Sequence, residues 1–142
     1  MRLFLDSSVV LAACGRPTGA SHYVFQLAPQ MGWSLLTSTY VVTEVEKNLR
    51  LRLPVSAESE WQQLSPMLQR VADVVTFNWP VLLGAGKDRP VLFTAAAFSE
   101  ALLTLDQTDF GGLMKSGFYG LQVLTPGDFL RRERATGRLP AL

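Results

Sequence analysis

The stretch Leu3-Phe4-Leu5-Asp6-Ser7-Ser8 constrains the fold more than any other part of the chain. Three large apolar residues alone would fit either a helix or a strand. The Asp-Ser-Ser that follows favours a turn and a helix N-cap, which indicates a short buried strand ending at Asp6 and then a helix. Because ligands bind at the carboxyl ends of strands in open α/β sheets, Asp6 is predicted to lie where the chemistry takes place.

Strands and helices are predicted to alternate along the rest of the chain. Further strands are expected at residues 33–37, 73–77, 101–105 and 121–124. Helices are expected from Ser21 to Gly32, from Ser38 to Pro54, over 56–71 with a kink or break at Pro66, over 90–98, and from Thr125 onward, whereas 80–86 has no clear type. This alternation predicts an α/β fold in three layers, with helices on both faces of a central parallel sheet of about five strands.

Length and composition favour a compact soluble protein. The chain has 142 residues, of which 48% are hydrophobic and 18% charged, so we expect a single domain over residues 1–142. The longest apolar runs, such as Val91 to Phe98, are too short to span a bilayer. The first residues begin a strand and show no signal peptide, which predicts a cytoplasmic protein without a membrane partner.

The counts of cysteine and histidine limit the chemistry. Cys14 is the only cysteine and His22 the only histidine, so an intramolecular disulfide, a Cys/His zinc site and any mechanism with two histidines are excluded. Cys14 is expected to be a small buried hydrophobic residue. A reaction in this protein must therefore use carboxylates, hydroxyls, bases or a bound hard metal ion.

The charge is balanced overall but unevenly distributed. The net charge is +1, so no global field attracts nucleic acid. Lys47, Arg50 and Arg52 lie at the end of one predicted helix, where cations offset the helix dipole, and we interpret them in that way. A second group of arginines crowds the C-terminus, and the sequence leaves its role open.

Five acidic residues lie at the ends of predicted strands or in the segments that follow them. Asp6 and Asp106 end the first and fourth strands, Asp88 precedes a helix, Glu44 lies in the helix after the second strand, and Asp109 follows three residues after Asp106. In a parallel sheet the ends of strands one and four can be neighbours, so these carboxylates could meet at one edge. Asp6 and Asp88 would also serve as plain N-caps, and capping is compatible with metal binding.

Several of these assignments have a second interpretation. Glu44 and Glu46 flank the apolar stripe of their helix about equally, so spacing does not choose between them. Asp109 is either a ligand or a solvated turn residue. Ser8 and Thr104 either orient the acids by hydrogen bonding or are an ordinary helix cap and an ordinary strand residue.

The order of these pieces resembles the PIN domain family, the small metal-dependent ribonucleases common among bacterial toxin–antitoxin pairs, VapC-like toxins among them. Five segments carry the resemblance: Leu3–Val9, Ser38–Val45, Lys87–Leu92, Leu103–Phe110 and Val123–Leu130. One departure is visible in the turn Phe98-Ser99-Glu100-Ala101, which lacks the glycine usual in the family and is one residue shorter.

The resemblance implies a site, a cofactor and partners. It implies that Asp6, Glu44, Asp88 and Asp106 are catalytic, metal-binding acids, with Asp109 as an occasional extra ligand. It also implies Mg²⁺ or Mn²⁺ as the cofactor, RNA as the substrate and often a homodimer. If the protein is a toxin, the resemblance further implies a cognate antitoxin.

Repulsion between the carboxylates means that such a cluster requires cations or protons nearby. Two carboxylates at 4 Å repel each other by roughly 4 kcal/mol at an effective dielectric constant near 20, and a whole domain is stable by only about 5–15 kcal/mol. Protons or cations must neutralise the site. Oxygen-only ligands suit Mg²⁺ or Mn²⁺, and such ions activate water for phosphodiester hydrolysis.

Three functions are therefore compared. The first is a Mg²⁺-dependent endoribonuclease, which the order of the acids favours. The second is a catalytically silent PIN-like module that binds RNA or protein, which the short turn before Ala101 suggests. The third is a phosphoaspartyl hydrolase with Asp6 as nucleophile, although Ser8 stands where a second aspartate would be expected.

Overall fold

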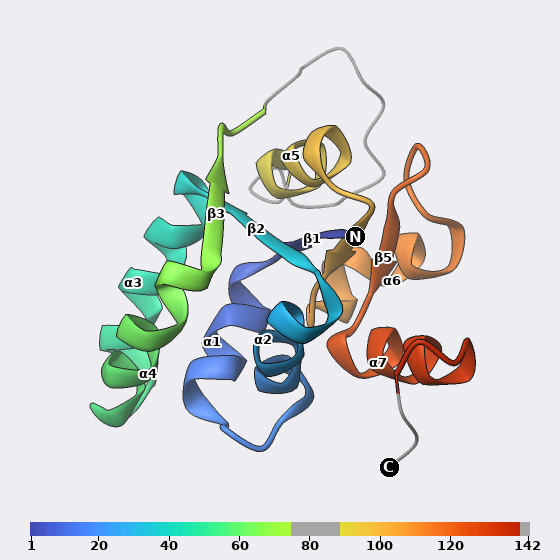
Figure 1. Cartoon of the computed structure of the whole chain (residues 1–142). Helices are drawn as coiled ribbons and strands as arrows, with labels where there is room; N and C mark the ends of the chain where they lie inside the picture. The colour runs from blue at the N-terminus through green and yellow to red at the C-terminus, as the bar shows by residue number, and fades with distance from the viewer. Residues whose placement is uncertain (75–88, 140–142) are drawn as a thin grey trace.

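A parallel five-stranded sheet organises the part of the chain that the structure, a computed structural model, describes, namely residues 1–74 and 89–139 (Figure 1). The strand order is β3-β2-β1-β4-β5, and every neighbouring pair is parallel. The strands are β1 (Arg2–Leu5), β2 (Ser34–Ser38), β3 (Leu68–Val71), β4 (Ala101–Leu103) and β5 (Gln122–Leu124). The predicted α/β fold with a central parallel sheet is confirmed.

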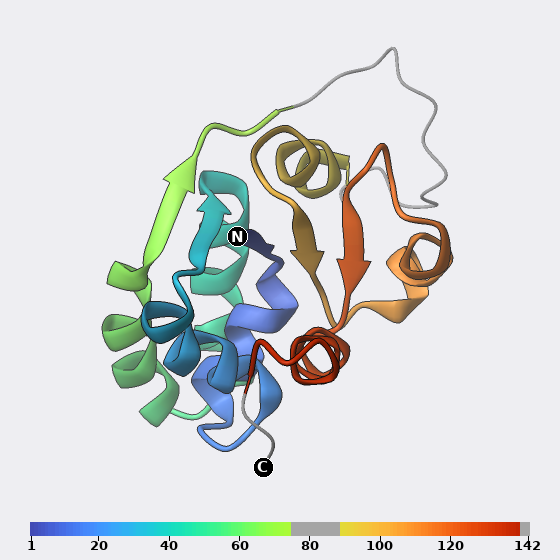
Figure 2. The same ribbon diagram turned by 45° about the vertical axis from the view of Figure 1, so that its right-hand side comes forward.

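Helices cover both faces of this sheet, which gives three layers consistent with a PIN-like fold. Helices α1, α2 and α7 lie below the sheet and α5 above it, while α3 and α4 flank the edge that carries β3 (Figures 1 and 2). Helix α6 packs against β5 at the opposite edge. The helices are α1 (Ser7–Gly15), α2 (Ala20–Met31), α3 (Thr39–Arg52), α4 (Ser56–Leu64), α5 (Arg89–Phe98), α6 (Gln107–Ser116) and α7 (Pro126–Ala135).

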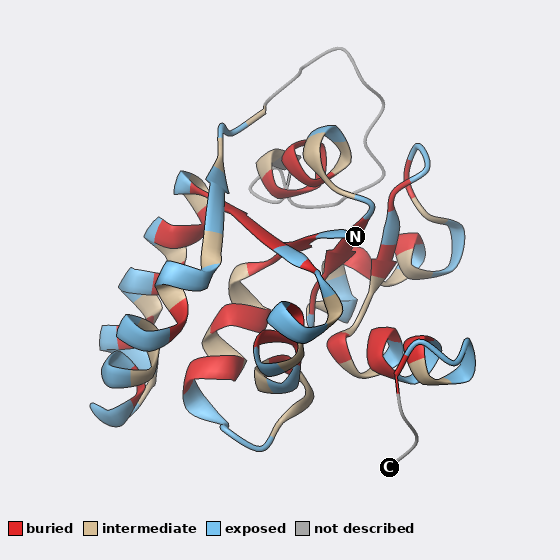
Figure 3. Cartoon of the chain, in the orientation of Figure 1, coloured by how far each residue is buried: buried red, intermediate tan, exposed pale blue. Residues whose placement is uncertain are grey.

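The central strand β1 is buried at every position after its first residue. Leu3, Phe4 and Leu5 are fully buried, and β1 is red in Figure 3 beyond its exposed first residue. Leu3 pairs in register with Leu35 of β2 on one side and with Ala101 of β4 on the other. A strand covered on both faces is expected to be continuously apolar, which explains why the run has no alternation. The chain leaves the sheet at Asp6, as predicted.

Local sequence signals set most of the helix boundaries. Gly32 ends α2 in the left-handed conformation, with φ of 70°, and Ser38 caps α3 by accepting a hydrogen bond from the Val41 N–H. Ser21, which was expected to open α2 as its N-cap, does not have that role, because the N-cap is Gly19. The helix begins one residue earlier, at Ala20, and Ser21 is buried within its first turn.

The third strand is not where the sequence analysis placed it. The helix expected over 56–71 ends at Leu64, a 3₁₀ turn (Ser65–Met67) follows, and β3 then begins at Leu68. Pro66 has no N–H to donate and ends the α-helix, and the stripe of apolar residues at helical spacing continued into the strand by coincidence. Of the strand expected at 73–77, the first two residues lie beyond β3, and the rest lies outside the described residues, as does the segment 80–86.

The fourth strand is shorter than predicted. It ends at Leu103 rather than at Leu105, and Asp106 is the N-cap of helix α6. The strand stops because the chain turns here. The Thr104 side chain and the Leu105 N–H hydrogen-bond to the β1–α1 junction, not to a neighbouring strand.

The short turn before β4 does not disturb the sheet. Ser99 extends α5 by donating its N–H to the Ala95 carbonyl, and the next residue, Glu100, donates its N–H to the Arg2 carbonyl at 3.0 Å. Strand β4 then pairs with β1 from Ala101 onward. The missing glycine therefore leaves the register of β4 against β1 intact.

The arginines near the C-terminus form contacts within their own region. Arg138 donates its Nε to Glu133 at 2.7 Å, and the Glu133 side chain is almost fully buried. Arg132 donates to the Gln122 side chain, and Arg131 pairs with Asp128. The Arg138 contact thus joins the segment after α7 to that helix, and the Arg132 contact joins α7 to β5. No helix in the described ranges has the length and apolar character needed to cross a membrane.

Candidate functional site

Asp6 lies at the centre of a hydrogen-bond network at the carboxyl end of β1. It caps α1, because its Oδ1 accepts the Ser7 N–H at 2.8 Å. Its Oδ2 accepts two hydroxyl donors, Ser8 at 3.0 Å and Thr104 at 2.7 Å. Both oxygens of a carboxylate with only 6% exposure are thus held in fixed directions. The capping role and a possible ligand role coincide in one side chain.

Thr104 connects Asp6 to Asp106. The Thr104 hydroxyl donates to Asp6 and accepts the Asp106 N–H at 3.1 Å, and Ser8 accepts the Leu105 N–H at 3.1 Å. Asp106 in turn caps α6, since its Oδ1 accepts the Asp109 N–H at 3.0 Å. Ser8 and Thr104 therefore orient Asp6 and the backbone before α6, and Ser8 is not the cap of α1.

Glu44 reaches the same network from α3. Its Oε2 accepts a hydrogen bond of 2.8 Å from the Ser7 hydroxyl, across 37 residues of sequence. Glu46 lies elsewhere on the helix and lines a separate pocket between α3 and α4. The ambiguity between the two glutamates is thus decided by the way α3 packs against α1, which spacing along one helix does not specify.

A pocket of about 240 Å³ opens where these segments meet. Three carboxylates line it, from Asp6, Glu44 and Asp106. They come from three parts of the chain that the parallel sheet brings to one edge. The other lining residues are Ser7, Ser8, Leu11, Asn48 and Arg52.

Burial shapes the acidity of Asp6. Loss of solvation raises the pKa of the Asp6 carboxyl above its ordinary value, and the nearby charge of Glu44 raises it further. The hydrogen bonds from Thr104, Ser8 and the Ser7 N–H act in the opposite direction but do not outweigh burial. Without a cation, burial therefore disfavours the ionised form of Asp6. A bound cation would favour the ionised form.

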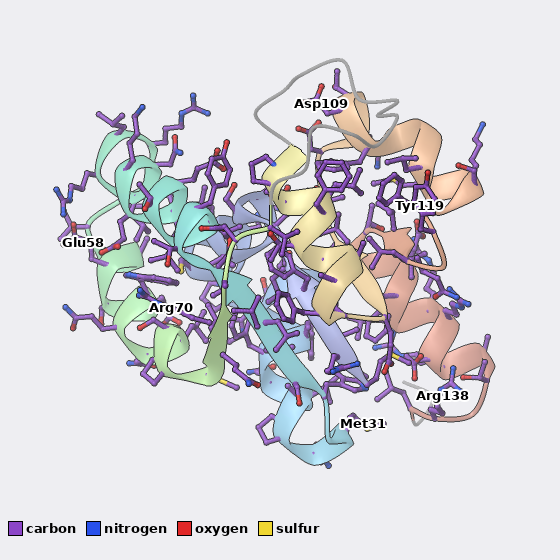
Figure 4. All side chains as sticks on the ribbon, turned by 90° about the horizontal axis from the view of Figure 1, so that it is seen from above. Met31, Glu58, Arg70, Asp109, Tyr119 and Arg138 are labelled. Atoms are coloured by element: carbon purple, nitrogen blue, oxygen red, sulfur yellow. The ribbon has the colours of Figure 1, made fainter. Side chains whose placement is uncertain are left out.

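Two other predicted acids are not among the pocket residues. Asp88 lies outside the described residues. Asp109 lies in the first turn of α6 (Figure 4), where its backbone N–H bonds to Asp106, and its side chain does not line the pocket. The ligand roles of both residues stay predictions.

Three polar residues of this pocket were not predicted from the sequence. Ser7 was treated only as part of a turn, yet its hydroxyl holds Glu44. Asn48 and Arg52 follow Glu44 at intervals of four residues, which places them on the same side of α3. That spacing was visible in the sequence, but it gains meaning only once Glu44 is known to face the site.

The residues present fit a hydrated hard cation. The atoms of these acids and hydroxyls that could bind a metal ion are all oxygens, which Mg²⁺ and Mn²⁺ prefer as ligands. Within the described ranges, no three His, Cys, Asp or Glu residues stand close enough to hold one ion directly. Mg²⁺ often keeps several waters and uses only one or two protein carboxylates, so this spacing is compatible with it.

The arrangement speaks against Asp6 as a covalent nucleophile. An attacking carboxylate must present an oxygen to its substrate. In Asp6, Oδ1 accepts a backbone N–H and Oδ2 accepts two hydroxyls, in a side chain that is almost completely buried. The phosphoaspartyl hydrolase is therefore the least supported of the three functions.

Comparison with known proteins supports the fold. No protein-family model matches the sequence, and no curated protein sequence matches it. The fold is similar to a chain in the crystal structure of VapBC2 from Rickettsia felis bound to a DNA fragment from their promoter. The similarity has a TM-score of 0.62 and covers 87% of this chain and 97% of that chain. Because the sequence identity is 10%, it bears on the fold alone, where it agrees with a PIN-like arrangement.

Proposed function

We propose that this protein is a metal-dependent endoribonuclease that hydrolyses phosphodiester bonds in RNA with Mg²⁺ or Mn²⁺. One observation carries the proposal: three carboxylates from distant segments, Asp6, Glu44 and Asp106, line one pocket at the carboxyl edge of a parallel sheet. This is the edge at which open α/β sheets bind ligands. The similarity in fold to a chain of VapBC2, a toxin–antitoxin complex, also supports this proposal.

Hydrogen bonds from neighbouring side chains hold the acids in fixed positions, as such a reaction requires. Ser8 and Thr104 hold the Asp6 carboxylate from one side, and Ser7 holds Glu44. A hard cation at such acids lowers the pKa of water and offsets the charge that develops on a phosphodiester. The hydroxyls keep the acids pointing into the pocket, so little reorganisation is required when a cation and a phosphate arrive.

The decisive experiment compares the wild-type chain with Asp6→Asn. We expect purified protein to cleave RNA with Mg²⁺ or Mn²⁺, and we expect EDTA and Asp6→Asn each to abolish the cleavage. Asp6→Asn keeps the shape of the side chain while removing its charge. Cleavage that survives both EDTA and Asp6→Asn would refute the proposal.

Partners form a second part of the proposal. A toxin of this kind would have an antitoxin, and the VapBC2 complex supports a search for one. Growth arrest upon expression, absent for Asp6→Asn, would support a toxin, and a small protein that relieves the arrest would identify the antitoxin. The homodimer is tested by light scattering of the purified chain, and a monomer at high concentration would contradict it.

The alternative is a catalytically silent PIN-like module that binds RNA or protein. It is favoured by the spacing of the acids, since the described residues contain no three acids arranged to hold one ion directly. Calorimetry with Mn²⁺ separates the two functions. Binding that is lost in Asp6→Asn supports the nuclease, whereas no binding in the millimolar range supports the silent module.

A further inference from the structure

A cation stands at the edge of the acidic pocket. Arg52 is the last residue of α3, its side chain is exposed, and it lines the pocket together with Asp6 and Glu44. The ion pairs found within the described ranges involve other side chains, so no described carboxylate forms an ion pair with Arg52. Its guanidinium is therefore free to contact an anion that enters the pocket.

The position of Arg52 follows from the geometry of α3. Glu44, Asn48 and Arg52 are spaced by four residues and share one side of the helix, and all three line the pocket. Eight residues of helix separate Glu44 from Arg52 by roughly 12 Å along the axis. Asn48, between them, donates its Nδ2 to the Glu44 carbonyl at 2.9 Å. One side of α3 thus presents to the pocket a carboxylate from Glu44 and, at the last residue of the helix, a guanidinium from Arg52.

Compensation of the helix dipole does not explain this placement. Arg50 also lies in the last turn of α3 and compensates the dipole equally well. Arg50, however, lines the separate pocket of about 100 Å³ between α3 and α4, with Glu46 and Glu58. Figure 4 labels Glu58 at the α4 side of the molecule. Two arginines of one helix turn therefore line different pockets, and only that of Arg52 contains Asp6 and Glu44.

We propose that Arg52 binds a backbone phosphate of the RNA strand, next to the phosphate that is cleaved, and so positions the strand along α3. That the bound nucleic acid is RNA rests on the proposed function. A guanidinium matches a phosphate with two parallel hydrogen bonds. A phosphate at this end of α3 is also farther from Glu44 than one at the centre of the pocket, so it is repelled less.

The test compares Arg52→Ala with Arg50→Ala. Both substitutions remove one positive charge from the same helix turn, so they have the same effect on net charge and dipole. Binding of a short fluorescent single-stranded RNA is measured by anisotropy in EDTA over a series of KCl concentrations. Steady-state cleavage of the same RNA is measured with Mg²⁺. Thermal unfolding of each variant confirms that it is folded, and Arg52→Gln provides a second neutral variant.

We expect Arg52→Ala to weaken RNA binding about tenfold at low salt, uniformly across RNA sequences. The slope of log affinity against log salt should fall by about 0.7, the value for one phosphate contact on a single strand. In cleavage, KM should rise while kcat changes little. Arg52→Lys should retain much of the binding, since lysine still offers a point charge to phosphate. Arg50→Ala should leave affinity and slope at the wild-type values.

Other outcomes separate this inference from the proposed function. If Arg52→Ala and Arg50→Ala bind RNA with the same affinity and slope, or if Arg52→Ala binds more tightly, the inference is overturned even when cleavage is normal. If RNA binding depends on Arg52 but no cleavage occurs with any metal, the inference stands and the nuclease proposal fails. A wild-type chain that binds no RNA, with or without Mg²⁺, overturns both.

Discussion

The Ser7 hydroxyl donates a hydrogen bond of 2.8 Å to Oε2 of Glu44 and thereby joins the first turn of α1 to α3. The same residue donates its backbone N–H to Asp6 Oδ1. One serine thus sets the positions of two carboxylates that arrive from different segments of the chain. Ser7 therefore links Asp6 to Glu44 across the contact between α1 and α3.

Replacing Ser7 by alanine should weaken the site more than the fold. Loss of one partly buried hydrogen bond costs about 1 kcal/mol of stability. Loss of the group that orients a metal-binding acid typically costs about 10–100-fold in metal affinity or activity. We expect Ser7→Ala to lower kcat/KM for RNA cleavage and Mn²⁺ affinity within that range, measured by kinetics and calorimetry. Ser7→Thr, which keeps a hydroxyl, is the control, and an equal loss in both variants would argue that the hydroxyl is irrelevant.

The two glutamates of α3 should differ sharply in their effect. Glu44→Gln removes a pocket charge and is expected to reduce RNA cleavage by at least about tenfold. Glu46→Gln changes a residue of the separate α3–α4 pocket and should leave cleavage within twofold of wild type, an estimate of roughly 0.4 kcal/mol for a surface substitution. Parallel assays of the two variants under identical Mg²⁺ concentrations decide the matter. Equal losses would mean that the Ser7–Glu44 contact does not mark the functional glutamate.

The fold was predictable where local chemistry and hydrophobic pattern agree. The apolar run before Asp6, the glycine at the end of α2 and the serine at the start of α3 each act through their own neighbours, and each prediction was correct. The third strand failed because Leu68 and Val71 continue a helical spacing past Pro66. Whether such residues pair with β2 or extend a helix depends on sheet contacts that no local pattern contains.

The proximity of two of the predicted acids was foreseeable from the sequence, but the hydrogen-bond network around them was not. Strand ends in a parallel sheet must meet at one edge, so the proximity of Asp6 and Asp106 followed from the predicted topology. The choice between Glu44 and Glu46 depended on helix packing. The contribution of Ser7 depended on a side chain 37 residues away from its partner. These are tertiary facts, and residue type alone does not specify them.

The pH dependence of stability should reveal the cost of burying the ionised Asp6 carboxylate. Its pKa is raised in the folded state above the ordinary value of 3.8, so the folded protein binds this proton more tightly than the unfolded chain. Between the two pKa values stability therefore falls as the pH rises, and above the folded pKa the penalty is fully present. In EDTA at neutral pH, Asp6→Asn should be more stable than wild type, and the difference should vanish at acidic pH.

Denaturant unfolding across a pH series measures this difference. Asparagine keeps the shape of the side chain, and the Ser8 and Thr104 hydroxyls, which each accept one backbone N–H, have a second lone pair that can accept from the amide. If the proposed metal site is correct, addition of Mg²⁺ should stabilise wild type more than Asp6→Asn, because the variant lacks one of the three pocket carboxylates. A variant that is less stable than wild type at every pH would contradict the expected burial penalty.

Cys14 should be inert in the native protein. Its side chain is 3% exposed, and burial raises the pKa of its thiol to about 11, with the charge of Glu60 adding to the effect. Thiolate is the reactive form, so alkylation by iodoacetamide at pH 8 should be very slow in the folded state and rapid in denaturant. Mass spectrometry of labelled protein follows the reaction. Rapid labelling of folded protein would show that α1 opens locally.

Thr104 provides the sharpest test of the network, because valine has its shape without its hydroxyl. In Thr104→Val, Asp6 loses its 2.7 Å donor and the Asp106 N–H loses its acceptor. The Thr104 hydrogen bond lowers the pKa of Asp6, so its loss should raise that pKa further, and more Mg²⁺ and a higher pH should be needed for cleavage. The acidic limb of the pH profile of kcat/KM should therefore move to higher pH. Thr104→Ser, which keeps the hydroxyl, should restore the wild-type profile, and superimposable profiles for valine and wild type would exclude Thr104 from control of the site.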